Sequence, residues 1–175
     1  MRHLILFFSL FAFLNTHGQR ELPSTSIQKL NRSKDSLQLT VERKNSLSSI
    51  RTSARNEGIN ILLLAKTARS TKDQDALYIG NLEKKDVYRV NTSALVSKYA
   101  NETEKNLEKL FANAVAKQCV LFFDDADALF SKSTQPESIA NYIENLARGK
   151  KVLTIFWCEE DCLKWLRNSK YVAGQ

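Results

Sequence analysis

Three carboxylates near the middle of the chain are the residues whose types and spacing most clearly suggest chemistry. Asp124, Asp125 and Asp127 directly follow the apolar run 119–123, which has the composition of a strand buried on both faces. α/β sheets carry their chemistry at the carboxyl ends of such strands. Because three neighbouring carboxylates are costly to remove from water, they either face solvent or bind a metal or another positive group. Taken alone, the pattern fits a core strand that ends in a solvated acidic turn equally well.

Apolar runs separated by helical patterns predict the elements that would position these carboxylates. The predicted strands are residues 60–65, 86–90, 119–123 and 152–157. Between the second and third strands lies a helix that Asn101 can cap, with an apolar stripe at helical spacing. Another helix is expected at 139–146, ended by Gly149. Strands that alternate with helices imply a parallel sheet covered on both faces and joined by right-handed crossovers.

Composition indicates one folded domain with a basic surface. The chain has 175 residues, is 43% hydrophobic and contains only two prolines, which fits a globular protein with a sizeable core. Its formal charge is +7, but the basic residues are scattered and interleaved with acids. Since no basic stripe with interleaved aromatics is present, a solvated basic surface is favoured over a nucleic-acid site.

The first 19 residues have the pattern of a signal peptide. Arg2 and His3 form a basic start, residues 4–14 an apolar run, and residues 15–19 a small, polar exit. The apolar run is too short for an ordinary membrane span. We therefore expect an exported protein, periplasmic or secreted. The alternatives are an uncleaved anchor or a mistaken start codon, which would leave the protein membrane-anchored or cytoplasmic.

The next segment, residues 20–45, is rich in polar residues and predicts a solvated linker or a loosely held helix. Leu47, Ile50 and Ala54 continue an apolar helical face up to Gly58, which would stop that helix before the first strand. The main domain is therefore expected to cover residues 46–175.

The three cysteines do not suggest a disulfide framework, because their number is odd. Cys119 belongs to a predicted buried strand. Cys158 and Cys162 are four residues apart, and we favour two small, half-buried side chains over a bridge between them. A zinc site is not expected, since the only histidines, His3 and His17, lie in the predicted signal peptide.

Two stretches together resemble the AAA+ ATPases, in particular bacterial members that carry SKYxGETEKNL followed by FDEADALF. Residues 97–107 read SKYANETEKNL and residues 123–130 read FDDADALF, in the right order and with a helix of suitable length between them. The resemblance covers roughly residues 47–172. It implies an α/β fold, a three-layer P-loop NTPase-like core with a parallel sheet of about five strands flanked by helices. Because the chain ends soon after residue 172, the helical lid of the family and its second sensor arginine are expected to be missing.

The resemblance assigns roles to the first two carboxylates, which stand in the Walker B motif. Asp124 matches the acid that holds Mg²⁺, often through water, and Asp125 stands where a glutamate normally polarises the attacking water. The aspartate is one methylene shorter, which withdraws its carboxylate by ~1 Å, and a misplacement of that order can cost about 10²-fold in rate. Catalysis is therefore expected to be weakened.

The phosphate-binding loop of the family is not preserved. A P-loop needs glycines for its backbone shape, a lysine for the phosphate and a hydroxyl for Mg²⁺. The positions that correspond to the P-loop are residues 66–73, where Lys72 stands at the Walker lysine position and Asp73 replaces the residue with the hydroxyl. Lys66 and Thr71 replace the two glycines. Neither the glycines that the loop shape requires nor the charge pattern that phosphate requires is present, so we expect no normal ATP site.

Other positions of the family are kept in part. Trp157 stands where a polar sensor residue, usually Asn, is expected, and an indole cannot accept a hydrogen bond. Arg167 resembles one of the arginines that reach a neighbouring subunit's nucleotide, although its companion position is Leu166; the alternative is an ordinary exposed helix residue. Lys98 and Tyr99 resemble the pore-lining pair of substrate-threading relatives, or Tyr99 packs at the helix entry.

These observations predict an exported, degenerate AAA+ domain, a pseudo-ATPase that acts through protein interaction or scaffolding. No cofactor is predicted with certainty for it. Protein partners or self-association are expected rather than nucleic acid. The alternative is a weak ATPase that binds Mg-ATP through a divergent P-loop and remodels proteins, with Lys72, Asp124 and Asp125 as its remaining site. Nucleic-acid binding through the basic surface ranks third. Export favours the first hypothesis, because compartments outside the cytoplasm offer little ATP.

Overall fold

A six-stranded sheet organises the chain in the computed structural model, which describes residues 27–31, 39–65, 71–96, 102–131, 135–158, 164–166 and 170–173. Its strands are β1 (Ile27–Lys29), β2 (Ile61–Ala65), β3 (Val87–Asn91), β4 (Val120–Asp124), β5 (Thr154–Cys158) and β6 (Lys170–Ala173). The spatial order is β1-β3-β4-β5-β2-β6. Strands β2 to β6 are mutually parallel, and β1 runs antiparallel to β3. The expected parallel sheet of about five strands is thus confirmed, with β1 added at one edge.

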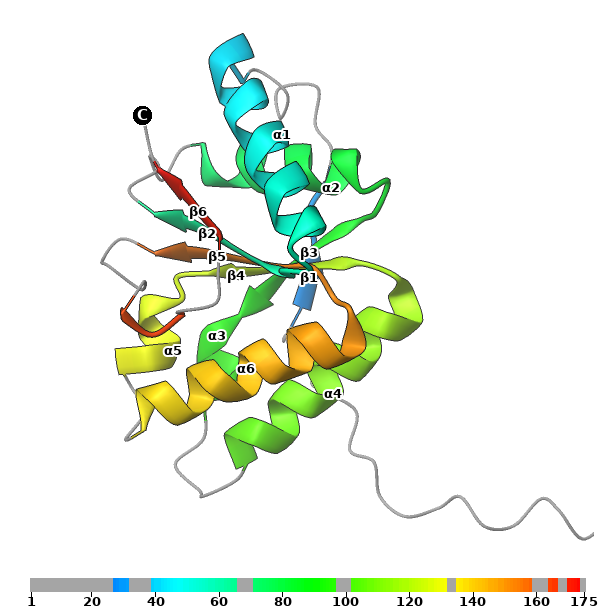
Figure 1. Cartoon of the computed structure of the whole chain (residues 1–175). Helices are drawn as coiled ribbons and strands as arrows, with labels where there is room; N and C mark the ends of the chain where they lie inside the picture. The colour runs from blue at the N-terminus through cyan, green and yellow to red at the C-terminus, as the bar shows by residue number, and fades with distance from the viewer. Residues whose placement is uncertain are drawn as a thin grey trace, which may run out of the picture.

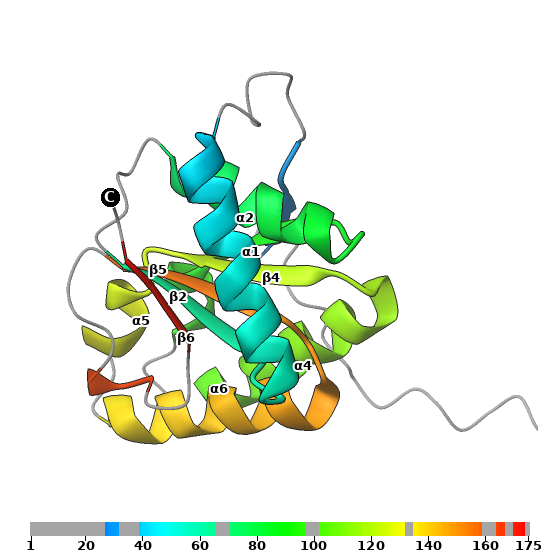
Figure 2. The same cartoon turned by 45° about the horizontal axis from the view of Figure 1, so that its top comes forward.

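Helices cover both faces of this sheet, as expected for a three-layer α/β fold. They are α1 (Val41–Asn56), α2 (Lys72–Leu82), α3 (Thr92–Leu95), α4 (Glu102–Lys117), α5 (Asp127–Ser131) and α6 (Pro136–Lys150). Figure 1 shows α1 and α2 on one face and α3 to α6 on the other, and Figure 2 shows α1 crossing above β2 and β6. No helix in the described part of the chain is both long and apolar enough to cross a membrane.

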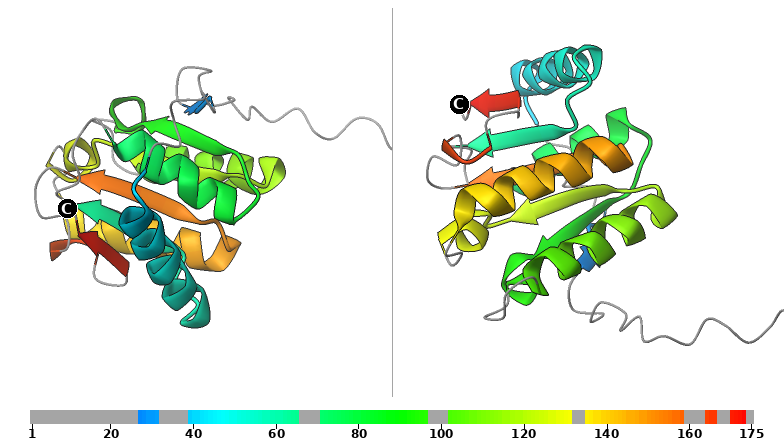
Figure 3. Two further views of the ribbon diagram at one scale, coloured as in Figure 1. Left: turned by 90° about the horizontal axis from the view of Figure 1, so that it is seen from above. Right: turned by 60° about the horizontal axis from the view of Figure 1, so that its bottom comes forward.

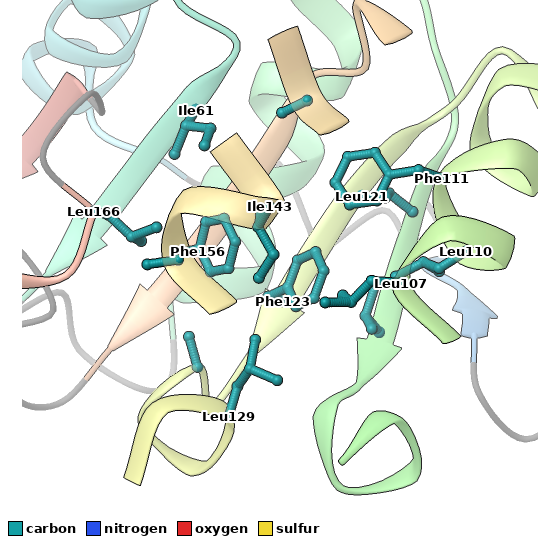
Figure 4. Packing of buried hydrophobic residues seen from close by; sticks show 14 of the residues in the cluster. Ile61, Leu107, Leu110, Phe111, Leu121, Phe123, Leu129, Ile143, Phe156 and Leu166 are labelled. Atoms are coloured by element: carbon teal, nitrogen blue, oxygen red, sulfur yellow. The ribbon is translucent and has the colours of Figure 1, made fainter. Parts of the chain in front are cut away.

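Alternating side chains along the strands build a core on each face. In β4, Leu121 and Phe123 join the cluster under α4 and α6, while Val120 and Phe122 join the cluster under α1 and α2. The rings of Phe123 and Phe156 stack with centroids 4.6 Å apart at the centre of the first cluster (Figure 4). Both faces of β4 are therefore dry, which explains its unbroken apolar sequence.

The segment predicted as a linker or loose helix contains a strand instead. Ile27–Lys29 forms β1, and the following Leu30 N–H donates to the Val87 carbonyl at 2.9 Å. Helix α1 begins only at Val41, where the Thr40 hydroxyl accepts a hydrogen bond from the Arg43 N–H at 3.2 Å. The sparse apolar content of residues 20–45 concealed β1, because an edge strand of three residues buries little.

Helix α1 is polar, and ion pairs fasten it to α2. The guanidinium of Arg43 binds both oxygens of Asp75, at 3.1 and 2.5 Å, and Asp75 is fully buried. Near the other end of the helix, Arg51 and Arg55 both donate to Glu83, at 2.7 and 2.5 Å. These ion pairs hold α1, a helix of low hydrophobicity, against α2.

The expected helix stops are right in one case and displaced in the other. Gly58 follows α1 with a φ of 69°, a left-handed conformation that glycine adopts without steric cost. Gly149, however, lies within α6, and the left-handed residue that ends this helix is Lys151, with a φ of 53°. The prediction that Gly149 ends the helix was wrong by two residues.

Candidate functional site

Asp124 lies at the carboxyl end of β4 and contacts the first residue of α2. It is paired in register with Asn91 of β3 and has the same parity along the strand as Phe122, so its side chain points toward the α1 and α2 face. The Lys72 ammonium donates a hydrogen bond to Asp124 Oδ1. Both side chains are largely buried, 12% exposed for Lys72 and 18% for Asp124. The two positions predicted for the phosphate-binding lysine and the magnesium-binding acid are therefore in direct contact.

Arg89 on β3 adds a second cation to this contact. Its Nε lies 3.2 Å from Asp124 Oδ2, an ion pair without hydrogen-bond alignment, and its Nη2 donates to Asp73 Oδ2. Asp73 lies in the first turn of α2, where a carboxylate is favoured by the helix dipole. Lys72, Asp73, Arg89 and Asp124 thus form a closed set of two cations and two carboxylates, called here the ion network.

The indole ring of Trp157 packs against the ammonium group of Lys72. The lysine Nζ lies 4.2 Å from the centroid of the indole ring, a cation–π contact, and the indole is 2% exposed. The Trp157 carbonyl accepts a hydrogen bond from the Ala126 N–H at 3.0 Å, which ties the turn after β4 to β5. The residue at the sensor position therefore offers Lys72 a π face, where the family pattern calls for an amide side chain.

Asp125 occupies a turn beside the network. It is exposed and has a φ of 61°, a left-handed conformation that aspartate tolerates better than most residues. Its carbonyl accepts from the Thr92 hydroxyl at 3.4 Å and from the Ala128 N–H at 3.2 Å. A pocket of about 430 Å³, also lined by Lys72, Arg89 and Asp124, opens at this point. The structure thus brings Lys72, Asp73, Asp124 and Asp125 together at one end of the sheet, and the roles assigned to them stay predictions.

Several predicted positions lie outside the described residues. Lys98 and Tyr99, the pore-like pair, are among them, as is Arg167. So are residues 66–70, most of the slot aligned with the P-loop, and Asn101, the predicted helix cap. Their assigned roles stay predictions.

The arrangement does not fit a magnesium–phosphate group. Mg²⁺ is held in such sites by one or two carboxylates together with the substrate's phosphates. Here both oxygens of Asp124 face cations, and Asp73, in the hydroxyl position, pairs with Arg89. Within the described ranges no three His, Cys, Asp or Glu residues are grouped as a metal site. A bound phosphate would have to compete with Asp124 for Lys72 and with Asp73 for Arg89.

Arg89 was missed from the sequence, although a signal for it was present. In β3 it stands two residues after Val87, which packs under α1 and α2, so a predicted strand at 86–90 already placed both side chains on one face. Its parallel neighbour, β4, ends at the acid that was predicted to hold metal. A basic residue that lies on the same face as Val87, near the end of the strand next to β4, was therefore a sign that Arg89 could reach Asp124.

The cysteines differ from expectation in one respect. Cys158, the last residue of β5, is disulfide-bonded, so the interpretation of unpaired cysteines was wrong for this residue. Cys162 lies outside the described residues. Cys119 is free and buried, and burial raises the pKa of its thiol to about 11.

Two solved structures resemble the chain in fold. A AAA domain of FIGL-1 in complex with ADP aligns with a TM-score of 0.57 and 19% identity, covering 86% of this chain and 59% of that chain. A chain of a HORMA:CdnC:Trip13 complex from E. coli MS115-1 aligns with a TM-score of 0.58 and 14% identity, covering 85% and 68%. At these identities the likeness concerns the fold.

Sequence comparison agrees with the structural likeness. A segment of 43 residues, 25% of this chain, is 46% identical to the uncharacterized AAA family ATPase y4kL of Sinorhizobium fredii (strain NBRC 101917 / NGR234) and spans 13% of that relative. The family model of the AAA ATPases, the ATPase family associated with various cellular activities, matches residues 63–159, more than half of the chain. The chain is therefore a member of the AAA family.

Proposed function

We propose that this chain is a degenerate AAA domain, a pseudo-ATPase that acts by protein interaction or scaffolding. The observation that carries the proposal is the contact between Lys72 and Asp124. In an ATPase of this family these positions serve the phosphate and the metal, whereas here each neutralises the other, with Arg89 and Asp73 completing the network. Charges that are already paired must be separated before they can bind nucleotide, and this lowers affinity.

The residue after Asp124 supports loss of hydrolysis as well. Asp125 has a shorter side chain than the glutamate of the family pattern and lies on the exposed side of the turn. Enzymes accelerate phosphoryl transfer by positioning the reacting groups and by electrostatic stabilisation, so a displaced base lowers the rate. Trp157 at the sensor position adds a second defect, because its ring cannot orient a water molecule by accepting a hydrogen bond.

We further propose export from the cytoplasm. The signal-like residues 1–19 motivate this localisation, and the disulfide at Cys158 supports it, since disulfides persist mainly in oxidising compartments. Loss of the nucleotide site agrees with a compartment poor in ATP. N-terminal sequencing of the protein recovered from cells tests this point: a new terminus near residue 20 is expected, and an intact Met1 contradicts cleavage.

Protein partners are the proposed targets of the domain. One structural neighbour was solved within a complex of several proteins, so this fold supports assembly with other chains. Lys98, Tyr99 and Arg167 are the positions at which pore and intersubunit contacts would be sought. Whether the chain assembles with itself is read directly from its mass in solution, by light scattering.

A specific observation favours the second candidate, a weak ATPase that binds Mg-ATP. Lys72 is the first residue of α2, a helix amino terminus that can bind anions, and it lies beside Asp124. A neighbouring fold was solved with ADP bound. On this hypothesis Lys72, Asp124 and Asp125 would rearrange when nucleotide arrives.

Thermal unfolding with and without Mg-ATP distinguishes the two candidates. A ligand at about 1,000 times its Kd stabilises a protein by about 4 kcal/mol, which for a chain of this size raises Tm by about 8–16 °C. We expect no rise at millimolar Mg-ATP. A rise of several degrees that Lys72→Ala abolishes would establish the ATP-binding candidate, whereas a rise that persists in this variant would indicate binding elsewhere.

A further inference from the structure

Five lysines gather at the end of the sheet opposite the ion network. They lie in the turns and helix ends that precede three neighbouring strands: Lys84 and Lys85 before β3, Lys117 before β4, and Lys150 and Lys151 before β5. The register places Val87 beside Val120 and Leu121 beside Thr154, so these connections are adjacent. Figure 1 and both panels of Figure 3 show the turns at the same end of the molecule, away from the strand arrowheads. We call this surface the basic edge.

The charge of the basic edge is not neutralised by the acids near it. The neighbouring acids are engaged elsewhere: Glu57 pairs with Lys170, Glu83 with Arg51 and Arg55, and Asp86 with Lys29. Within the described part of the chain, none of the five lysines forms an ion pair, and all except the half-buried Lys85 are exposed. Lys117 additionally lies 5.6 Å from the centroid of the Tyr88 ring, a contact that leaves its charge in place.

Aliphatic side chains are exposed at the same end. Leu82, the last residue of α2, is 37% exposed, and Val115, in the last turn of α4, is 48% exposed. Only one other large apolar side chain in the described residues, Val41, is exposed. The basic edge therefore combines uncompensated positive charge with two accessible aliphatic groups.

We propose that the basic edge docks on a lipid bilayer that contains anionic headgroups. Each lysine close to such a surface is attracted to its negative potential, and exposed aliphatic groups can enter the boundary between headgroups and acyl chains. Nucleic acid is the less suitable partner. The exposed positive charge of the edge is supplied mainly by lysine, and no exposed aromatic ring lies there to stack on bases, whereas arginine forks and stacking aromatics are typical of nucleic-acid surfaces. The predicted signal or anchor at residues 1–19 already leads the chain to a membrane.

Docking through this edge has a geometric consequence. Because the basic edge and the ion network lie at opposite ends of the parallel strands, the pocket beside Asp124 and Asp125 would face away from the bilayer. The carboxyl edge of the sheet would then be open to protein partners. The inference is independent of the nucleotide question, since no residue of the ion network takes part.

Vesicle sedimentation with the full chain tests the proposal. Vesicles of phosphatidylglycerol and phosphatidylcholine are compared with vesicles of phosphatidylcholine alone, at about 0.1 M salt, where surface charges still act over ~10 Å. One variant carries lysine-to-glutamine changes on the basic edge, at Lys84, Lys117, Lys150 and Lys151. The matched control removes the same charge from other surfaces, at Lys44, Lys105, Lys109 and Lys164. Residues 1–19 are common to all three proteins, so any affinity of that segment for lipid cancels.

We expect the unaltered chain and the control variant to bind anionic vesicles, and the basic-edge variant to bind at least about a hundredfold more weakly. Equal binding by the two variants, or equal binding of the unaltered chain to neutral and anionic vesicles, overturns the proposal. Tighter binding to duplex DNA than to vesicles, lost only in the basic-edge variant, also overturns it in favour of nucleic acid. Should the variant unfold, binding of the unaltered chain must still fall steeply between about 0.1 and 1 M salt, and salt-independent binding overturns the proposal.

Discussion

Lys72, at the start of α2, donates a hydrogen bond to Asp124, at the end of β4, on the carboxyl edge of the sheet. The sequence assigns these positions to phosphate and to metal, but in the structure each side chain meets the charge of the other. Arg89 lies against the remaining oxygen of Asp124, and Trp157 lies under the lysine. The two side chains and their neighbours thus contact one another within the domain.

If the ion network is structural, breaking it destabilises the fold. Lys72→Met leaves a largely buried Asp124 with only the poorly aligned Arg89, and we expect the free energy of unfolding to fall by about 1–3 kcal/mol. Urea unfolding measures this, with Lys105→Met, an exposed helical lysine, as the control that should change little. A Lys72→Met variant as stable as the unaltered protein would show that the pair does not hold the domain together.

The pair formed by Arg43 and Asp75 should be the strongest single ionic contribution to the attachment of α1. Because Asp75 is fully buried and bound by both arms of the guanidinium, Asp75→Asn should cost about 3–5 kcal/mol in urea unfolding. The control is Asp73→Asn, two residues earlier in the same turn, whose carboxylate is 41% exposed and should matter by about 1 kcal/mol or less. Equal costs for the two variants would contradict this ranking.

Glu83 should make stability depend on acid pH. Burial opposes its ionisation, but the hydrogen bonds from Arg51 and Arg55 outweigh burial and lower its pKa below the ordinary value of 4.5. A lowered pKa in the folded state means that its stabilisation is complete above pH 4.5 and is lost as the pH falls through the folded pKa. Unfolding free energies measured from neutral to acid pH should therefore decline less steeply in Glu83→Gln. An unchanged slope would mean that the ion pairs of Glu83 are not maintained in solution.

The three cysteines should differ in reactivity. In the folded protein at pH 8, Cys119 should resist iodoacetamide, because it is buried and a pKa of about 11 leaves few thiolates. In denaturant without reductant, mass spectrometry should find one label, on Cys119, and after reduction a label on each cysteine. Three labels without reductant would show that Cys158 is free in the isolated protein and would remove one support for export.

The sequence predicted the elements better than it predicted their side-chain partners. Strands β2 to β5 and the helix before β4 follow from apolar runs and helical stripes, since burial dictates both patterns. Strand β1 was not predicted because one half-buried and two exposed residues leave no such pattern. The proximity of Lys72, Asp73, Asp124 and Asp125 followed from the family resemblance.

What pairs with these residues could not be read from their spacing. Arg89, a half-buried residue on a strand, meets Asp124 only because β3 and β4 are neighbours, and strand order is a property of the whole fold. The contact between Lys72 and Trp157 depends in the same way on β5. The charged residues at the positions of the P-loop could be read from the sequence, whereas the ion pairs that neutralise them could be seen only in the folded structure.

Calorimetric titration of the full chain with Mg-ATP tests the central claim most directly. Since Lys72 and Arg89 are already paired with Asp124 and Asp73, we expect no saturable heat in the micromolar range, either in the unaltered protein or in Lys72→Ala. Micromolar binding by the unaltered protein that disappears in Lys72→Ala would contradict the account and identify the site as a working nucleotide site.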